Sequence, residues 1–143
     1  MRIFHTSDWH LGQSFFGYDR TKEHVLYLKW LMNFVKENKI DLLLISGDVF
    51  DSSNPSAESQ SIYYSFLHKI TQQNPNLQII IIAGNHDSAA RLEAPNPLLQ
   101  EMNVFVRGSI KKDENKNIKL DDLIIPIKIN NKVEAVCLAV PFI

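Results

Sequence analysis

The sequence predicts an α/β fold with a parallel sheet and a C-terminal hairpin, and three features support that prediction. Two runs of four apolar residues, Leu42–Ile45 and Ile79–Ile82, are typical of strands buried on both faces of a parallel sheet. Longer segments with helical periodicity alternate with these runs, as the crossover connections of a parallel sheet require. Asn130-Asn131 separates two apolar segments between residues 123 and 140, which indicates a tight hairpin turn.

The first elements follow this pattern in order. Residues 2–7 are predicted to form a short buried strand, followed by a polar loop over residues 8–12. A helix is expected from about Thr21 to Asn38, because apolar residues recur there at helical spacing: Val25, Leu28, Leu31, Met32 and Val35. The second buried strand then ends in Ser46-Gly47-Asp48.

The next helix has a clear predicted start at Asn54-Pro55, with Asn as N-cap and Pro at the first helical position. Its apolar residues cover more than one stripe, so either it lies deep in the core or it offers a second face to a partner. The remaining expected elements are a strand over 77–83, a short helix capped by Ser88, a helix over 96–102, a strand over 104–106, a charged surface loop over 109–122 and the hairpin over 123–140.

Composition restricts the class of protein. The chain has 143 residues, 45% apolar and 22% charged, which suits a single soluble domain. A net charge of −1 argues against binding of nucleic acid through bulk charge. Cys137 is the only cysteine, so no disulfide forms within the chain and a buried thiol is expected. Without a leader-like or membrane-spanning stretch, the expected location is the cytoplasm, with no membrane partner.

Three predicted strands each end in a polar cluster: Asp8-Trp9-His10, Gly47-Asp48 and Gly84-Asn85-His86-Asp87. The carboxyl ends of parallel strands share one edge of a sheet, so the clusters are expected to converge there. Asp8 and His10 are two residues apart, and in extended backbone their side chains would point the same way. Each cluster could also be an ordinary polar turn, and it is their repetition at three strand ends that favours a site.

The residue types in these clusters predict metal chemistry on phosphate. Carboxylate, imidazole and amide ligands suit Mn²⁺, Zn²⁺ or Fe²⁺ better than a thiolate-seeking ion. Asp48 could bridge two cations about 3.5–4 Å apart, which would clamp a phosphate and activate water for in-line attack. His86 would then be free to protonate the leaving oxygen as a general acid. Asp87 would supply a charge or cap the following helix.

These motifs resemble those of the calcineurin-like metallophosphoesterases, which run D-x-H, G-D and G-N-H-D. The resemblance covers roughly residues 1–90 and narrows to the SbcD-type nuclease family on residues 5–12, 47–51 and 84–88. It implies a layered α/β sandwich and a two-metal DNA exonuclease or endonuclease that processes double-strand breaks, most readily with Mn²⁺, and with Mg²⁺, Zn²⁺ or Fe²⁺ as alternatives. It also implies an SbcC-like SMC-type ATPase partner and a homodimer formed through helices near 55–72 and 96–102.

The resemblance also implies a role for each motif residue. Asp8 and His10 would bind the first metal, Asp48 would bridge, Asn85 would bind the second metal, and His86 would handle the leaving-group proton. Some relatives carry histidine where this chain has Asp51, so Asp51 either acts at the transition state or only orients its loop.

The later histidine motifs of the family, including G-H-x-H, do not occur after His86. We therefore expect residues 1–143 to be the N-terminal part of one nuclease domain, with weak or no activity by itself. His5, His24 and His68 lie outside any motif: His5 is expected to be half-buried, and the other two to have packing or surface roles.

Two other functions remain open at this stage. A protein phosphatase or cyclic-nucleotide phosphodiesterase would use the same metal motifs. A non-catalytic dimerisation or DNA-docking module would use apolar helix residues, for which Tyr63, Phe66 and Leu99 are the candidates if they are exposed. Acidic residues are interspersed among the lysines of the charged loop, which favours a solvated loop over a phosphate contact.

Overall fold

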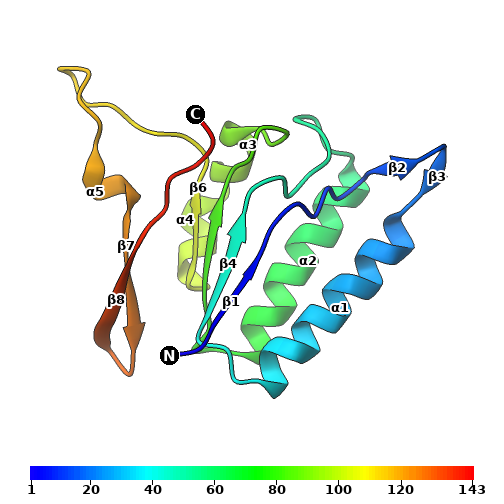
Figure 1. The fold of residues 1–143 in the computed structure, drawn as a ribbon, viewed down its shortest axis with the longest axis horizontal. Coiled ribbons are helices and arrows are strands. Elements are labelled where there is room, and N and C mark those ends of the chain that lie inside the picture. Colours follow the sequence, from blue (N-terminus) through cyan, green and yellow to red (C-terminus); the bar gives the residue numbers. More distant parts are fainter.

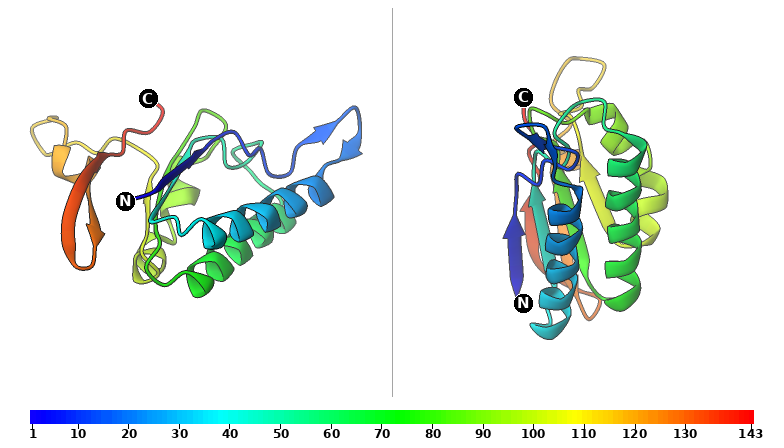
Figure 2. Two further views of the ribbon diagram at one scale, coloured as in Figure 1. Left: turned by 60° about the horizontal axis from the view of Figure 1, so that its bottom comes forward. Right: turned by 90° about the vertical axis from the view of Figure 1, so that its right-hand side faces the viewer.

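A four-stranded parallel sheet forms the middle of the molecule in a computed structural model that describes residues 1–143 (Figure 1). Helices cover one face of the sheet and a hairpin covers the other, which gives three layers (Figure 2). The strands lie in the order β1-β4-β5-β6, with bounds β1 Ile3–Thr6, β4 Leu42–Ser46, β5 Gln78–Ile82 and β6 Val104–Arg107. The predicted α/β class with a parallel sheet is confirmed.

All neighbouring strands run parallel, so their carboxyl ends lie along one edge. Leu42 pairs with Ile3 on one side and with Gln78 on the other, and Ile79 pairs with Val104. The prediction that the first strand is buried is wrong. Strand β1 lies at the edge of the sheet, where Ile3 is 49% exposed and His5 is exposed rather than half-buried.

The helix face holds the larger core. Helices α1 (Thr21–Glu37) and α2 (Ala57–Gln73) pack against the sheet with 21 buried residues in one cluster. The predicted N-cap at Asn54 is wrong, because the N-cap lies two residues later at Ser56, whose hydroxyl accepts the Ser59 N–H at 3.1 Å. Two short helices, α3 (Ala89–Glu93) and α4 (Asn96–Glu101), contact strand β6 on the same side.

The prediction that Tyr63, Phe66 and Leu99 are exposed dimer contacts is wrong. Each is at most 2% exposed and belongs to the helix-side core. Helix α2 packs against α1 and shares the helix-side core with the sheet, so its broad apolar surface is used inside the chain. The outer residue of helix α4 is Leu98, which is 73% exposed.

The opposite face carries the predicted hairpin, formed by β7 (Ile124–Ile129) and β8 (Lys132–Leu138) after a short helix α5 (Leu120–Leu123). Asn130 and Asn131 have φ angles of 50° and 63°, as a two-residue hairpin turn requires. Only five residues form the buried cluster between hairpin and sheet. Gln78 ties the layers together, because its side chain donates to the Pro126 carbonyl at 3.0 Å.

Three smaller findings complete the fold. The segment after the first strand forms a two-stranded hairpin that the sequence pattern did not predict, with β2 at Ser14–Phe15 and β3 at Tyr18–Asp19. Cys137 is partly rather than fully buried. None of the helices has both the length and the apolar character that crossing a membrane demands.

Candidate metal centre

The loops after β1 and β4 run side by side and bring the first two polar clusters together. The backbone N–H groups of Asp8 and His10 donate to the carbonyls of Gly47 and Asp48, at 3.1 and 2.9 Å. Asp8, His10 and Asp48 have φ angles of 55°, 47° and 50°. The expectation of extended backbone between Asp8 and His10 is therefore wrong. Left-handed residues, uncommon outside glycine, turn both side chains toward the sheet edge instead.

Asp8, His10 and Asp48 form the first group of side chains that could hold a cation. The His10 Nε2 atom lies 4.0 Å from Asp8 Oδ1 and 3.8 Å from Asp48 Oδ2, and the three ligand atoms lie within 4.8 Å of one another. Two ligands about 2.1 Å from one ion are at most about 4.2 Å apart. Both distances from His10 satisfy that limit, so this group fits a divalent ion.

A second group joins the other side of the His10 ring to Asp51 and His86. His10 Nδ1 is buried and lies 3.2 Å from Asp51 Oδ1, but the two atoms are not aligned for a hydrogen bond. The rings of His10 and His86 are 5.0 Å apart between centroids. A buried imidazole nitrogen without a partner is costly, and a cation bound near it would supply one.

His86 is oriented by the loop after β4. Its ring Nδ1–H donates to the Asp51 carbonyl at 2.9 Å, which leaves Nε2 as the free ring nitrogen. That hydrogen bond, followed by the nearby carboxylates of Asp48, Asp51 and Asp87, raises the pKa of His86, although partial desolvation opposes the shift. The raised pKa favours the protonated form of the ring more than in an ordinary histidine.

Asp87 connects the turns that follow β4 and β5, and it caps no helix. Its carboxylate accepts backbone N–H groups from Gly84, Val49 and Phe50, at 2.9, 3.1 and 2.9 Å. A carboxylate that accepts three N–H groups makes strong, charge-assisted hydrogen bonds. Sequence reasoning left the role of Asp87 open, because its partners lie on another strand end.

Asp48 is the most enclosed of these carboxylates, at 9% exposure. Its Oδ1 accepts the His86 backbone N–H at 3.0 Å, which leaves Oδ2 toward His10. Gly84 makes this approach feasible, because a Cβ there would overlap the Asp48 carboxylate and backbone nitrogen. Asn85 is exposed and its side chain makes no hydrogen bond within the chain, so its role as a ligand stays a prediction.

Comparison with known proteins identifies the family. The model of the calcineurin-like phosphoesterases matches residues 1–134. The chain belongs to that family. Among its relatives, the SbcD component of the nuclease SbcCD from Rhodobacter capsulatus is 42% identical over 144 residues, covering 100% of this chain and 35% of the relative. The components of the same name from Escherichia coli K12 and Bacillus subtilis 168 are 37% and 39% identical, each over 76% of this chain and 27% of the relative. This calcineurin-like phosphoesterase chain thus spans about a third or less of those relatives.

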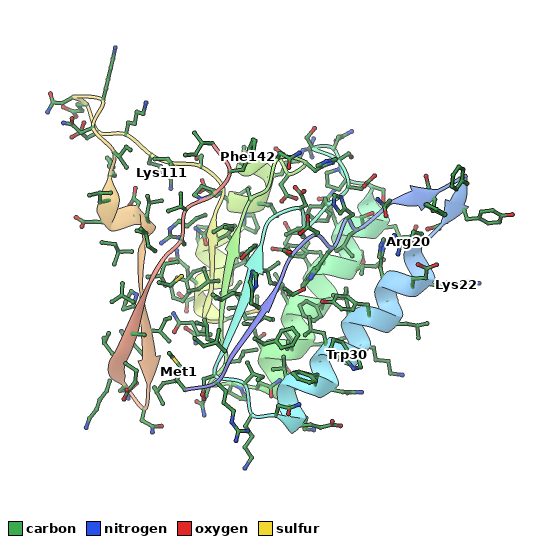
Figure 3. All side chains as sticks on the ribbon, viewed as in Figure 1. Met1, Arg20, Lys22, Trp30, Lys111 and Phe142 are labelled. Atoms are coloured by element: carbon green, nitrogen blue, oxygen red, sulfur yellow. The ribbon has the colours of Figure 1, made fainter.

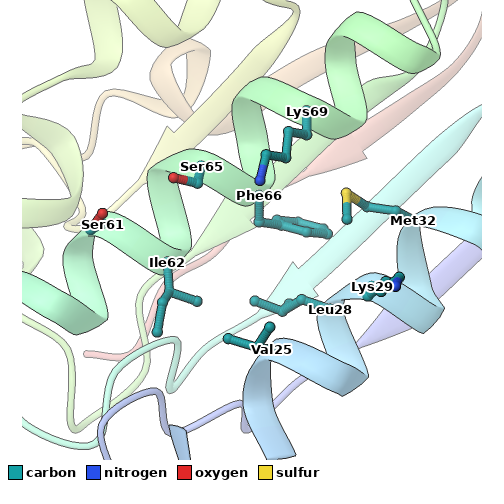
Figure 4. Close-up of a pocket in the computed structure, with 9 residues that line it drawn as sticks. All are labelled: Val25, Leu28, Lys29, Met32, Ser61, Ile62, Ser65, Phe66 and Lys69. Carbon is teal, nitrogen blue, oxygen red and sulfur yellow. The ribbon is translucent and has the colours of Figure 1, made fainter. Parts of the chain in front are cut away.

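Membership in the calcineurin-like phosphoesterases implies divalent metal ions, and the two side-chain groups of this structure offer ligands for them. An apolar hollow of the molecule lies elsewhere. It is a groove of about 420 Å³ between α1 and α2 (Figure 4), lined by Val25, Leu28, Lys29, Met32, Ser61, Ile62, Ser65, Phe66 and Lys69. None of these residues belongs to a strand-end cluster, so the groove has no part in the metal centre.

Proposed function

We propose that this chain carries the metal-binding core of a DNA nuclease, which hydrolyses phosphodiester bonds during double-strand-break processing and recombination. The observation that supports it best is the convergence of Asp8, His10 and Asp48 on one edge of the sheet, with His86 beside them. The relatives named as SbcD components of the nuclease SbcCD support the choice of DNA over other phosphoesters. Residues 1–143 would form part of a single metallophosphoesterase nuclease domain.

The proposed ligands divide over two cations. Asp8, His10 and Asp48 would hold the first, and Asp48 and Asn85 would contribute to the second. Oxygen and imidazole ligands without thiolate suit Mn²⁺, Zn²⁺ or Fe²⁺, and of these and Mg²⁺ we propose Mn²⁺ on the resemblance to the SbcD-type nucleases. Two cations held there supply charge neutralisation of the phosphate and activation of water.

The chain's own residues would handle the proton and the geometry. His86 holds Nδ1–H on the Asp51 carbonyl, so Nε2 is the atom that would deliver a proton to the leaving oxygen. Its raised pKa makes the protonated form more available than in an ordinary histidine. The Asp51 carbonyl accepts the His86 Nδ1–H, which favours a positioning role for Asp51 at His86 over direct contact with the transition state.

The proposed partners follow from the same relatives. They are DNA, an SbcC-like SMC-type ATPase, and a second copy of the chain that docks through α2 and α4. Leu98, exposed on α4, replaces the buried Tyr63, Phe66 and Leu99 as the apolar contact for such a dimer. The cytoplasm is the proposed location.

The test uses the full-length protein with Mn²⁺ and three substrates: linear duplex DNA, a phosphoprotein and a cyclic nucleotide. We expect DNA to be degraded, and Asp48→Asn to reduce the rate at least 100-fold. Asp113→Asn, a matched change in a surface loop, should leave the rate unchanged. Hydrolysis of the phosphoprotein or cyclic nucleotide without DNA cleavage would assign one of the other phosphoesterase activities. No metal-dependent hydrolysis of any substrate would favour a non-catalytic docking module.

A further inference from the structure

A pocket of about 510 Å³ opens beside the metal centre, between the loop after β1 and the first turns of α1. Asp8 and His10 form one side of it. The rest of its lining consists mainly of residues to which the motifs assign no role: Trp9, Gln13, Arg20, Glu23, His24 and Tyr27. Figure 3 labels Arg20, which lies at the start of α1 beside the β2–β3 hairpin. The volume of the pocket is within the range of about 300–1,000 Å³ usual for small-ligand sites.

His24 is the residue that points to a ligand. Its side chain lines the pocket and the residue is only 7% exposed. Neither ring nitrogen has a hydrogen-bond partner within the chain, and neither is fully enclosed by it, so both are accessible to a ligand that enters the pocket. An imidazole can donate from one ring nitrogen and accept at the other, so His24 can recognise either kind of polar group on a ligand. A ligand in the pocket that offers a donor or acceptor would therefore find an unpaired partner in His24.

The side chains around His24 are held in place before any ligand arrives. The Arg20 guanidinium donates to Gln13 Oε1 at 2.6 Å and to Glu23 Oε2 at 2.8 Å. Tyr27 hydroxyl and Thr6 hydroxyl are 2.7 Å apart, and the Trp9 indole N–H donates to the same Thr6 oxygen at 3.0 Å. Such preorganisation lowers the entropic cost of binding.

The chemistry of the lining selects the class of ligand. Asp8 and Glu23 are negative and Arg20 is positive, so the formal charge of the lining is −1 with both histidines neutral. A phosphate group would therefore gain little binding energy in this pocket, because the lining is negative and Arg20 is already paired with Glu23. A neutral, planar group with donors and acceptors on its edge suits the aromatic surfaces of Trp9 and Tyr27 and the polar groups around them.

We propose that this pocket, through His24, receives the nucleobase of the nucleotide whose phosphate lies at Asp8 and His10. The inference rests on the proposed function, because that function places the phosphate at the mouth of the pocket. The start of α1 would then help to position the substrate, a role that none of the metal-binding motifs performs.

The test compares two probes with the full-length protein in Mn²⁺ by isothermal titration calorimetry: deoxyadenosine 5′-monophosphate and 2-deoxyribose 5-phosphate. We expect the nucleotide to bind at least tenfold more tightly, because only it carries a base. His24→Phe keeps the ring volume but removes both nitrogens, and it should weaken nucleotide binding about fivefold or more without changing the affinity for the sugar phosphate. His68→Phe is the matched control on an exposed helix position and should change neither affinity.

Equal affinities for the two probes would overturn the inference, as would an unchanged nucleotide preference in His24→Phe. If circular dichroism shows that His24→Phe is misfolded, Gln13→Ala replaces it with the same expected loss. Hydrolysis of bis(p-nitrophenyl) phosphate is measured in parallel. Mn²⁺-dependent hydrolysis without a preference for the nucleotide would reject only the role of the pocket as a base site. A preference for the nucleotide without hydrolysis would reject the proposed function and retain that role.

Discussion

The two faces of the central sheet are packed very differently. The helix side buries 21 residues in one cluster, and the hairpin side buries five. The loops that carry the candidate ligands belong to the helix side, because Trp9, Leu11, Val49 and Phe50 lie between or after the polar residues and enter that core. The geometry of the metal centre therefore depends on helix packing, whereas the hairpin cluster supports the sheet and includes no residue of these loops.

The largest expected effect tests this difference directly. Leu67→Ala removes a fully buried side chain of α2 and should lower the free energy of unfolding by about 3–5 kcal/mol. Ile127→Ala on the hairpin side should cost only about 2 kcal/mol, because the few side chains around it can close over the cavity. Urea denaturation followed by tryptophan fluorescence measures both. Equal losses would show that the two faces contribute alike.

A smaller effect is expected at the contact that joins the ligand loops. Asp87→Asn loses the charge that attracts three backbone N–H groups and places an amide donor against one of them. The free energy of unfolding should fall by about 2 kcal/mol, and Mn²⁺ affinity by about tenfold, as is usual when a group supporting the ligands is lost. Calorimetric titration measures the Mn²⁺ affinity, and the exposed Asp121→Asn is the control. Equal Mn²⁺ affinities of the two variants would contradict this prediction.

The sequence predicted the parts of this fold that depend on local pattern. Buried strands β4 and β5, helix α1 and the asparagine turn of the hairpin are encoded in runs and spacings of a few residues. The hairpin β2–β3 was missed because its strands are only two residues long and exposed. Which side of α2 faces solvent also could not be predicted, since it depends on α1 packing from a distant part of the sequence.

The candidate site shows the same limit. The motifs located Asp8, His10 and Asp48, and parallel strands explain why they converge. The left-handed backbone that aims Asp8 and His10 could not be predicted, because carboxylate and imidazole residues favour that conformation only weakly. The approach of Asp51 to His10 and the pocket around His24 join loops and helices through tertiary contacts, for which the sequence carries no periodic signal.

The smallest expected effect again separates the two faces, because the helix side contains His24 and the hairpin has no histidine. Burial, with help from Arg20, lowers the pKa of His24 below 6.5, while Glu23, Asp19 and Asp51 oppose the shift. The unfolded chain therefore binds the proton more readily than the folded one. As the pH falls below about 6.5, His24 makes unfolding progressively easier, until the pH passes its folded pKa.

Urea denaturation at pH 7.5 and pH 5.5 measures this contribution. The loss of unfolding free energy on acidification should be smaller in His24→Phe than in the wild type. In His68→Phe it should equal the loss in the wild type. Hydrogen exchange should assign the extra acid sensitivity of the wild type to α1 and not to β7 and β8. If acid released the hairpin first in both proteins, the five-residue cluster, and not the buried histidine, would limit stability at low pH.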